Sequence, residues 1–248
     1  NCCAAIATEV FRKAPNGPEF LRRVFCEVDI DARLISQTTE AELGFRTAAA
    51  LSGEELSDRA IVCWDSGGGS FQITSLDPES GLLRPPYMGS LGSGVVAVQC
   101  IEVIHGVSAS VRGSPNPLTR RQFDGLVDHL RGQLVRGVPE WLREAPMMTM
   151  IGGPLSLGQL CTNLCGSTTF TTHDVIGCVS KVIDRSDAEF ESLGMGEPHL
   201  VAVKLAFCLA VMLQLEMRTM QYKAAIGSCA GMVTHPGFRT FEVATIDV

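Results

Sequence analysis

The stretch Asp65-Ser66-Gly67-Gly68-Gly69-Ser70 lies between two apolar runs, residues 60–64 (AIVCW) and 71–74 (FQIT). Both runs are rich in β-branched and aromatic residues, so the pattern predicts a strand, a glycine turn and a second strand. Three consecutive glycines can adopt positive φ and direct several backbone N–H groups at one anion, usually a phosphate. Asp65 would then hold a cation or a water beside that phosphate. A hairpin turn that is glycine-rich for structural reasons only is the alternative, and this stretch alone supports both equally.

Composition limits the classes of partner. The chain has 248 residues, of which 46% are hydrophobic and 19% charged, which is typical of a globular protein with a buried core. Its formal net charge of −7 and the lack of a basic stripe argue against binding to duplex nucleic acid. The apolar stretch 200–217 includes Lys204, Gln214 and Glu216, so we predict a buried core helix there and no association with a membrane.

Ten cysteines are spread irregularly along the chain without a Cys-x-x-Cys pair, which argues against a zinc ribbon. Cys161 and Cys165 are four residues apart and could share a helix face. With no histidine or second pair nearby in the sequence, a structural role is favoured over a metal site. Buried free thiols fit a reducing compartment, and no signal peptide is visible, so we expect a cytoplasmic protein.

Strand patterns alternate with helix patterns, which predicts an α/β chain. Thr38 or Thr39 is expected to cap a helix over residues 40–51, and Thr119 to cap the helix over 120–137. Further strands are expected at residues 2–7, 29–36, near Leu83, 147–151 and 220–226, and further helices at 94–105, 172–183 and 200–217.

The order of the motifs resembles the exopolyphosphatase/guanosine pentaphosphate phosphatase (Ppx/GppA) family. Residues 7–17 (ATEVFRKAPNG), 34–43 (LISQTTEAEL) and 65–70 (DSGGGS) follow the family patterns "ATSALRDAxNG", "VISGxEEAxL" and "DIGGGS" in that order. Downstream, residues 90–96 look like "SLPLGAV", residues 151–154 like "GTGGT", and the helix opening at Pro198 like "RADxLPAGLAIL".

This resemblance implies an actin-like (ribonuclease-H-like) ATPase-type fold of two α/β domains with the active site in the cleft between them. Residues 1–46 would be the latter part of the first domain, 47–57 a linker, 58–235 the second domain and 236–248 a tail. The front of the first domain, which carries a "DIGTNS"-like phosphate loop in the family, would be absent. Residues 241–248 (FEVATIDV) resemble the strand that leads into that loop, through coincidence, circular permutation or omission of residues.

The implied activity is release of terminal phosphate from inorganic polyphosphate or a phosphorylated guanosine nucleotide by metal-assisted attack of water. Glu40 corresponds to the family's general base, and Asp65 would hold Mg²⁺ or the attacking water, with Gln72 as a further metal ligand. The phosphate-binding residues would be Gly67, Gly68, Gly69, Ser70, Gly152, Gly153 and Arg12. Each has a structural alternative: a helix-start carboxylate for Glu40, a strand-to-helix turn for the second glycine pair, and a solvated surface for Arg12.

Several departures from the family pattern weaken the enzyme reading. Gln72 stands where the family has a glutamate, so the Mg²⁺ site should be weaker, and Pro154 and Ala97 replace a threonine and an arginine. A catalytically weakened or inactive module that binds phosphate, a nucleotide or a protein is therefore the alternative. An ATPase of the sugar-kinase or chaperone type is less favoured. The oligomeric state stays open, with a homodimer among the options.

Overall fold

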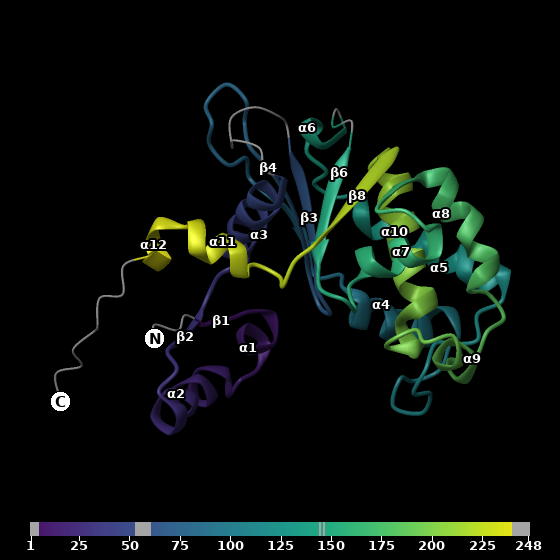
Figure 1. Cartoon of the computed structure of the whole chain (residues 1–248). Helices are drawn as coiled ribbons and strands as arrows, with labels where there is room; N and C mark the ends of the chain where they lie inside the picture. The colour runs from purple at the N-terminus through teal and green to yellow at the C-terminus, as the bar shows by residue number, and fades with distance from the viewer. Residues whose placement is uncertain (1–4, 53–60, 144, 146, 240–248) are drawn as a thin grey trace.

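The computed structural model describes residues 5–52, 61–143, 145 and 147–239 (Figure 1). The elements in chain order are β1 (Ala5–Ala7), α1 (Glu9–Lys13), α2 (Gly17–Val28), β2 (Ala32–Leu34), α3 (Gln37–Ser52), β3 (Val62–Ser66), β4 (Phe71–Ser75), β5 (Tyr87–Gly89), α4 (Ser93–Gln99), a π-helical turn (Cys100–Ile104), α5 (Arg120–Leu134), α6 (Glu140–Arg143), β6 (Met148–Gly152), α7 (Leu157–Cys165), β7 (Thr169–Thr171), α8 (Thr172–Cys178), a 3₁₀ turn (Val179–Lys181), α9 (Asp187–Ser192), a second 3₁₀ turn (Pro198–Leu200), α10 (Val201–Gln214), β8 (Thr219–Ala224), α11 (Cys229–Thr234) and α12 (Pro236–Arg239).

Six strands form the main sheet in the order β5-β4-β3-β6-β8-β7. The predicted hairpin is confirmed, because β3 and β4 pair antiparallel with Trp64 opposite Ile73 and Asp65 opposite Gln72. β3, β6 and β8 run parallel, whereas β5 and β7 pair antiparallel with their neighbours. An antiparallel meander extended by parallel strands is the ribonuclease-H-like arrangement that the motif order implies.

The third strand of the meander is not where the sequence pattern placed it. Leu83 makes only an isolated bridge to Leu76, and β5 begins at Tyr87, after Pro85 and Pro86. Proline has no N–H to donate to a sheet, so the pairing resumes only once the two prolines have passed.

Helices cover both faces of this sheet (Figure 1). α3 and α11 pack together on one face, and α10 lies on the other with α4, α5 and α7 around it. The helix predicted at residues 200–217 is confirmed as a core helix, since every residue from Val201 to Met212 is buried. Among the described helices, none is long and apolar enough to cross a membrane.

α3 begins earlier than predicted and has a different cap. Ser36 accepts a hydrogen bond from the Thr39 N–H through Oγ (3.0 Å), so Ser36 is the capping residue and the prediction of Thr38 or Thr39 was wrong. The helix continues to Ser52, six residues into the stretch expected to be a linker. The helix packs on β3, β4 and β6, so it is part of the layer that covers the main sheet.

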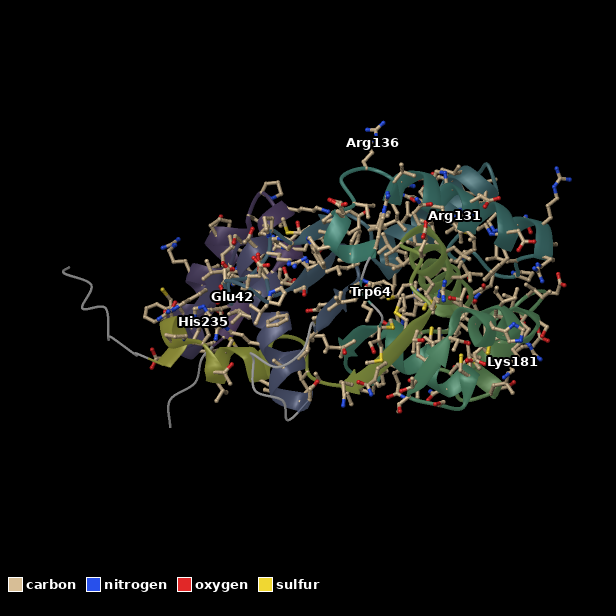
Figure 2. All side chains as sticks on the ribbon, turned by 90° about the horizontal axis from the view of Figure 1, so that it is seen from above. Glu42, Trp64, Arg131, Arg136, Lys181 and His235 are labelled. Atoms are coloured by element: carbon tan, nitrogen blue, oxygen red, sulfur yellow. The ribbon has the colours of Figure 1, made fainter. Side chains whose placement is uncertain are left out.

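α11 is anchored on α3 at both ends. The Gly231 N–H donates to Thr47 Oγ1 (2.8 Å), and His235 Nε2 lies 3.1 Å from Glu42 Oε1, as Figure 2 shows from above. This anchoring fixes the segment just before α11, which follows the end of β8.

The first 30 or so described residues form a small separate layer (Figure 1). β1 and β2 pair parallel, with Ala5 opposite Ala32, and α1 and α2 pack beside them. The Arg33 guanidinium lies over the Phe238 ring, 5.9 Å from its centroid, which joins β2 to α12.

Candidate functional site

A cleft of about 590 Å³ opens at the carboxyl ends of the parallel strands β3, β6 and β8. Ligands of α/β sheets commonly bind outside the carboxyl ends of parallel strands. The residues that line it are Ile6, Thr8, Glu40, Asp65, Ser66, Gly67, Gly68, Ser93, Gly152, Gly153, Pro154, Leu155, Ser156, Leu157, Glu197, Leu200, Lys204, Ile226, Gly227, Ser228 and Cys229. The cleft therefore brings together Glu40, Asp65 and parts of both glycine turns.

Asp65 is the second-last residue of β3 and lines the cleft. Side chains alternate across a strand, so Cys63, which packs against α3, and Asp65 share one face, whereas Trp64 packs against α10 on the other. Gly44 of α3 leaves room for the carboxylate, because a Cβ there would lie 3.3 Å from Asp65 Oδ2. Burial, together with the nearby negative charge of Glu40, raises the pKa of Asp65 from 3.8 to about 7.

Glu40 occupies the first turn of α3, four residues before Gly44, and so lies on the same helix face. Its Oε2 accepts a hydrogen bond from Arg12 Nη2 at 2.8 Å, and Arg12 also donates to the Ile35 carbonyl at 2.9 Å. Arg12 is not among the residues that line the cleft. The guanidinium therefore orients the Glu40 carboxylate, and a contact of Arg12 with phosphate stays a prediction.

The first glycine turn differs from its prediction. None of its three glycines has φ in the left-handed region, so the expected positive-φ arrangement was wrong. Gly67 donates its N–H to the Ser70 carbonyl (3.0 Å), so this amide is not free for a phosphate. Only Gly67 and Gly68 of the turn line the cleft, whereas Gly69 and Ser70 do not.

The beginning of α4 fixes the turn from outside. The Gly67 carbonyl accepts from the Ser93 N–H (3.1 Å), and the Gly68 carbonyl accepts from the Gly94 N–H (2.8 Å). Gly92 touches the turn so closely that a Cβ would lie 2.5 Å from the Gly69 nitrogen. These contacts from the SLGSG segment, together with the hairpin, hold the glycine turn in one conformation.

Ser66 is a cleft residue that the sequence analysis did not identify. Its Oγ is buried, and no described residue forms a hydrogen bond with it. The predicted hydroxyl of Ser70 is instead buried and accepts from Gln72 Nε2 at 3.3 Å. An unpartnered hydroxyl beside Asp65 is available to a phosphate oxygen or a water. The only signal in the sequence was its place between Asp65 and the glycines.

The second glycine turn links β6 to α7. The Gly152 carbonyl accepts from the Tyr222 hydroxyl (2.8 Å) and from the Ala225 N–H (2.9 Å). Ser156 donates its N–H to the Gly153 carbonyl (3.0 Å) and caps α7 through its side chain. The turn is thus a strand-to-helix connection, as the structural alternative supposed, and it also lines the cleft.

Lys204 was also missed as a site residue. It is only 4% exposed, yet it borders the cleft, and its Nζ donates to the Leu155 carbonyl (2.6 Å) and to Glu197 Oε2 (2.5 Å). A single lysine within an apolar run of a core helix was the available signal. Among the described residues that line the cleft, Glu40, Asp65 and Glu197 are acidic and Lys204 is the single lysine or arginine.

Glu9 brings another carboxylate to the first glycine turn. It begins α1 and pairs with Lys13. A Cβ on Gly69 would lie 1.6 Å from Glu9 Oε2, so the carboxylate lies directly on this glycine. The two residues are far apart in sequence, and no local pattern indicated this contact.

The donors that a metal ion would need are few. Asp65 has no hydrogen-bond partner among the described residues, and its carboxylate fits Mg²⁺, which is usually bound by one or two carboxylates and by substrate phosphates. Gln72 lies opposite Asp65 in the hairpin, is 2% exposed and does not line the cleft. The described part of the chain holds no group of three or more His, Cys, Asp or Glu residues that could bind a metal.

Comparisons with known proteins agree with the motif order. Residues 2–89 match the model of the Ppx/GppA phosphatase family, whereas no curated protein sequence matches the chain. An exopolyphosphatase-like protein has the same fold (TM-score 0.71, 16% identity, 93% of this chain and 74% of that chain). So do the Ppx-GppA enzyme of Aquifex aeolicus (0.70, 17%, 93% and 74%) and an exopolyphosphatase from Cytophaga hutchinsonii (0.68, 14%, 93% and 73%). At these identities the likeness establishes the fold, and the predicted actin-like fold is confirmed.

Proposed function

We propose that the chain, of which residues 2–89 match the Ppx/GppA family model and which shares the fold of Ppx/GppA structures, is a phosphohydrolase of this family. It would release terminal phosphate from inorganic polyphosphate or a phosphorylated guanosine nucleotide by metal-assisted attack of water. The observation that carries the proposal is the convergence of Glu40, Asp65, Ser66 and two glycine turns on one cleft.

We assign to Glu40 the role of orienting the attacking water or accepting its proton. Arg12 holds its Oε2, while Oε1 has no hydrogen-bond partner among the described residues. A carboxylate fixed through one oxygen can orient a water, or accept its proton, through the other. This positioning is the main contribution that a protein makes to phosphoryl transfer, together with neutralisation of the charge on the transferred group.

Asp65 is placed to hold a divalent cation against the substrate. Mg²⁺ bound by this carboxylate and by phosphate oxygens would supply positive charge beside that of Lys204, which is paired with Glu197. Ser66 would donate its free hydroxyl to a phosphate oxygen, and Gly68, where a Cβ would meet no atom within 4 Å, would lie against the same group.

The test is phosphate release from tripolyphosphate and from guanosine pentaphosphate, with Mg²⁺ present. Glu40→Gln should reduce the turnover by roughly 10²–10⁴-fold, the usual contribution of a positioned acid or base. Glu42→Gln is the matched control, since Glu42 lies two residues further along α3, pairs with Arg46 and His235, and does not line the cleft. Equal turnover in wild type and Glu40→Gln would refute the mechanism.

A binding module that has lost catalysis is the second candidate, and the position of Gln72 favours it. Gln72 stands where the family pattern has a glutamate, is 2% exposed and does not line the cleft, so a metal ion at Asp65 would lack a second carboxylate from this strand. Calorimetric titration with the same two substrates separates the candidates. Binding without phosphate release, unchanged in Glu40→Gln, would support the binding module, and release that depends on Glu40 would exclude it.

We further propose a cytoplasmic setting for this activity. The eight cysteines among the described residues are free thiols, which is the state that a reducing compartment maintains.

A further inference from the structure

Four cysteines lie close together on three packed helices, α7, α8 and α10; α7 is the helix that follows the second glycine turn. Cys161 and Cys165 lie on α7, Cys178 ends α8, and Cys208 lies on α10. The neighbouring Cys208 thiol and burial raise the pKa of Cys161, and Cys165 Sγ lies 3.7 Å from Cys178 Sγ. The second cysteine pair that the sequence spacing lacked is thus supplied by α8 and α10.

The Cys165–Cys178 pair is held at the ends of two packed helices. Cys178 donates its Sγ–H to the Leu164 carbonyl (3.2 Å), and Lys181, labelled in Figure 2, donates its Nζ to the same carbonyl (2.6 Å). Both contacts fix α8 and the 3₁₀ turn after it against the last turn of α7. The two sulfur atoms therefore stay neighbours without a covalent bond.

Access differs between the two pairs. Cys165 is partly exposed, whereas Cys161 and Cys208 are completely buried. A small reagent can reach the Cys165 sulfur but neither sulfur of the deeper pair. The exposed Cys26 and Cys229 have no neighbouring thiol among the described residues.

We propose that Cys165 and Cys178 are a redox-modifiable dithiol that a peroxide converts into an intramolecular disulfide. The Cys165 thiolate attacks one peroxide oxygen, forming a sulfenic acid and releasing hydroxide. The Cys178 thiolate then attacks the oxidised sulfur, forms the S–S bond and releases the oxygen as water. The sum is two thiols and one hydrogen peroxide giving one disulfide and two waters.

The surroundings of Cys165 also predict how the rate depends on pH. Burial and the neighbouring Cys178 raise the pKa of Cys165, so the thiol is mostly protonated near neutral pH. Since the thiolate is the reactive form, formation of the disulfide should accelerate roughly tenfold per pH unit below that pKa.

The experiment treats the intact protein with hydrogen peroxide, removes the peroxide, unfolds the protein in N-ethylmaleimide, and maps the peptides by mass spectrometry. We expect a cross-linked peptide that joins Cys165 to Cys178 and lacks two hydrogen atoms. Cys161 and Cys208 should both carry the maleimide in the same sample and so serve as the internal control. A Cys178→Ser variant should lose the cross-link and leave Cys165 as a sulfenic or higher oxide.

Two outcomes would overturn the proposal. One is maleimide on both Cys165 and Cys178 under conditions that oxidise the exposed Cys26. The other is a cross-link of Cys165 to a cysteine other than Cys178. Because the wild-type map alone distinguishes these results, the test does not depend on whether the variant folds.

Discussion

Replacement of Asp65 by asparagine measures the free energy that the ionised carboxylate costs the folded protein. Its pKa rises from 3.8 in an ordinary environment to about 7 in the fold. Below about pH 4 the carboxyl is protonated in both states and costs nothing. As the pH rises from about 4 toward 7, Asp65 ionises in the unfolded chain before it does in the fold. The free energy of unfolding therefore falls over this range, and above about pH 7 the native state carries the full cost of the ionised carboxylate.

The magnitude follows from the same values. Since a factor of ten in an equilibrium constant is about 1.4 kcal/mol, a rise from 3.8 to about 7 corresponds to at most ~4 kcal/mol. Asp65 is only partly buried and borders an open cleft, so solvent screening reduces this to about 2 kcal/mol. Asparagine keeps the shape without the charge. Asp65→Asn should therefore match the wild type near pH 4 and be about 2 kcal/mol more stable near pH 8.

The assay is thermal unfolding of both proteins between about pH 4 and pH 8, without Mg²⁺, where 2 kcal/mol is about 4–8 °C for a chain of this size. Asp128→Asn is the control, because that side chain is 77% exposed and should give no pH-dependent difference. If Asp65→Asn and the wild type differ equally at both ends of the pH range, the inferred cost of ionising Asp65 is refuted.

The remaining predictions concern the walls of the cleft and use urea unfolding. Gly92→Ala should destabilise the protein by about 2 kcal/mol or more, because its Cβ would lie 2.5 Å from the backbone of the glycine turn. Gly132→Ala, with open space at its helix position, should instead gain up to ~1 kcal/mol, and a similar loss in both variants would contradict the clash. Tyr222→Phe should lose about 1 kcal/mol with its bond to the second glycine turn, and no loss would show that this bond does not hold the turn. Lys204→Met should lose about 1–2 kcal/mol and weaken binding of tripolyphosphate by leaving the Glu197 carboxylate unpaired at the cleft, whereas unchanged or tighter binding would mean that this pair does not affect the substrate.

The main sheet was predictable where local chemistry decided it. The residues around the glycine turn specify both strands of the hairpin, because both runs are rich in β-branched and aromatic residues and are buried nearly throughout. Thr119 was correctly predicted to cap α5, because threonine and Gln122 form a capping box within four residues. The cap of α3 was not resolved by sequence, since Ser36, Thr38 and Thr39 are all capable residues and only packing selects Ser36.

Other features depend on contacts between distant segments. Three glycines permit many values of φ, and the contact with Gly92 and the N–H groups of α4 select a conformation without positive φ. α7 and α11 carried no recognised pattern, although both shape the cleft. The carboxylate of Glu9 meets Gly69 only because β1 and α1 fold against the main sheet, which a pattern within one segment does not record.

The cations near the cleft are already paired with carboxylates. Arg12 matches an arginine of the family pattern, and its guanidinium is bonded to Glu40, so its charge stabilises that carboxylate. Lys204 is likewise paired with Glu197. Neither cation is free to neutralise a polyanion. Burial, and after it the negative charge of Glu40, raises the pKa of Asp65 to about 7. A phosphate substrate must therefore enter with a cation or displace one of these pairs. The proposed hydrolysis is compatible with entry of a cation or with displacement of Glu197 from Lys204, but not with loss of the Arg12–Glu40 pair, because Arg12 holds the carboxylate that would orient the water.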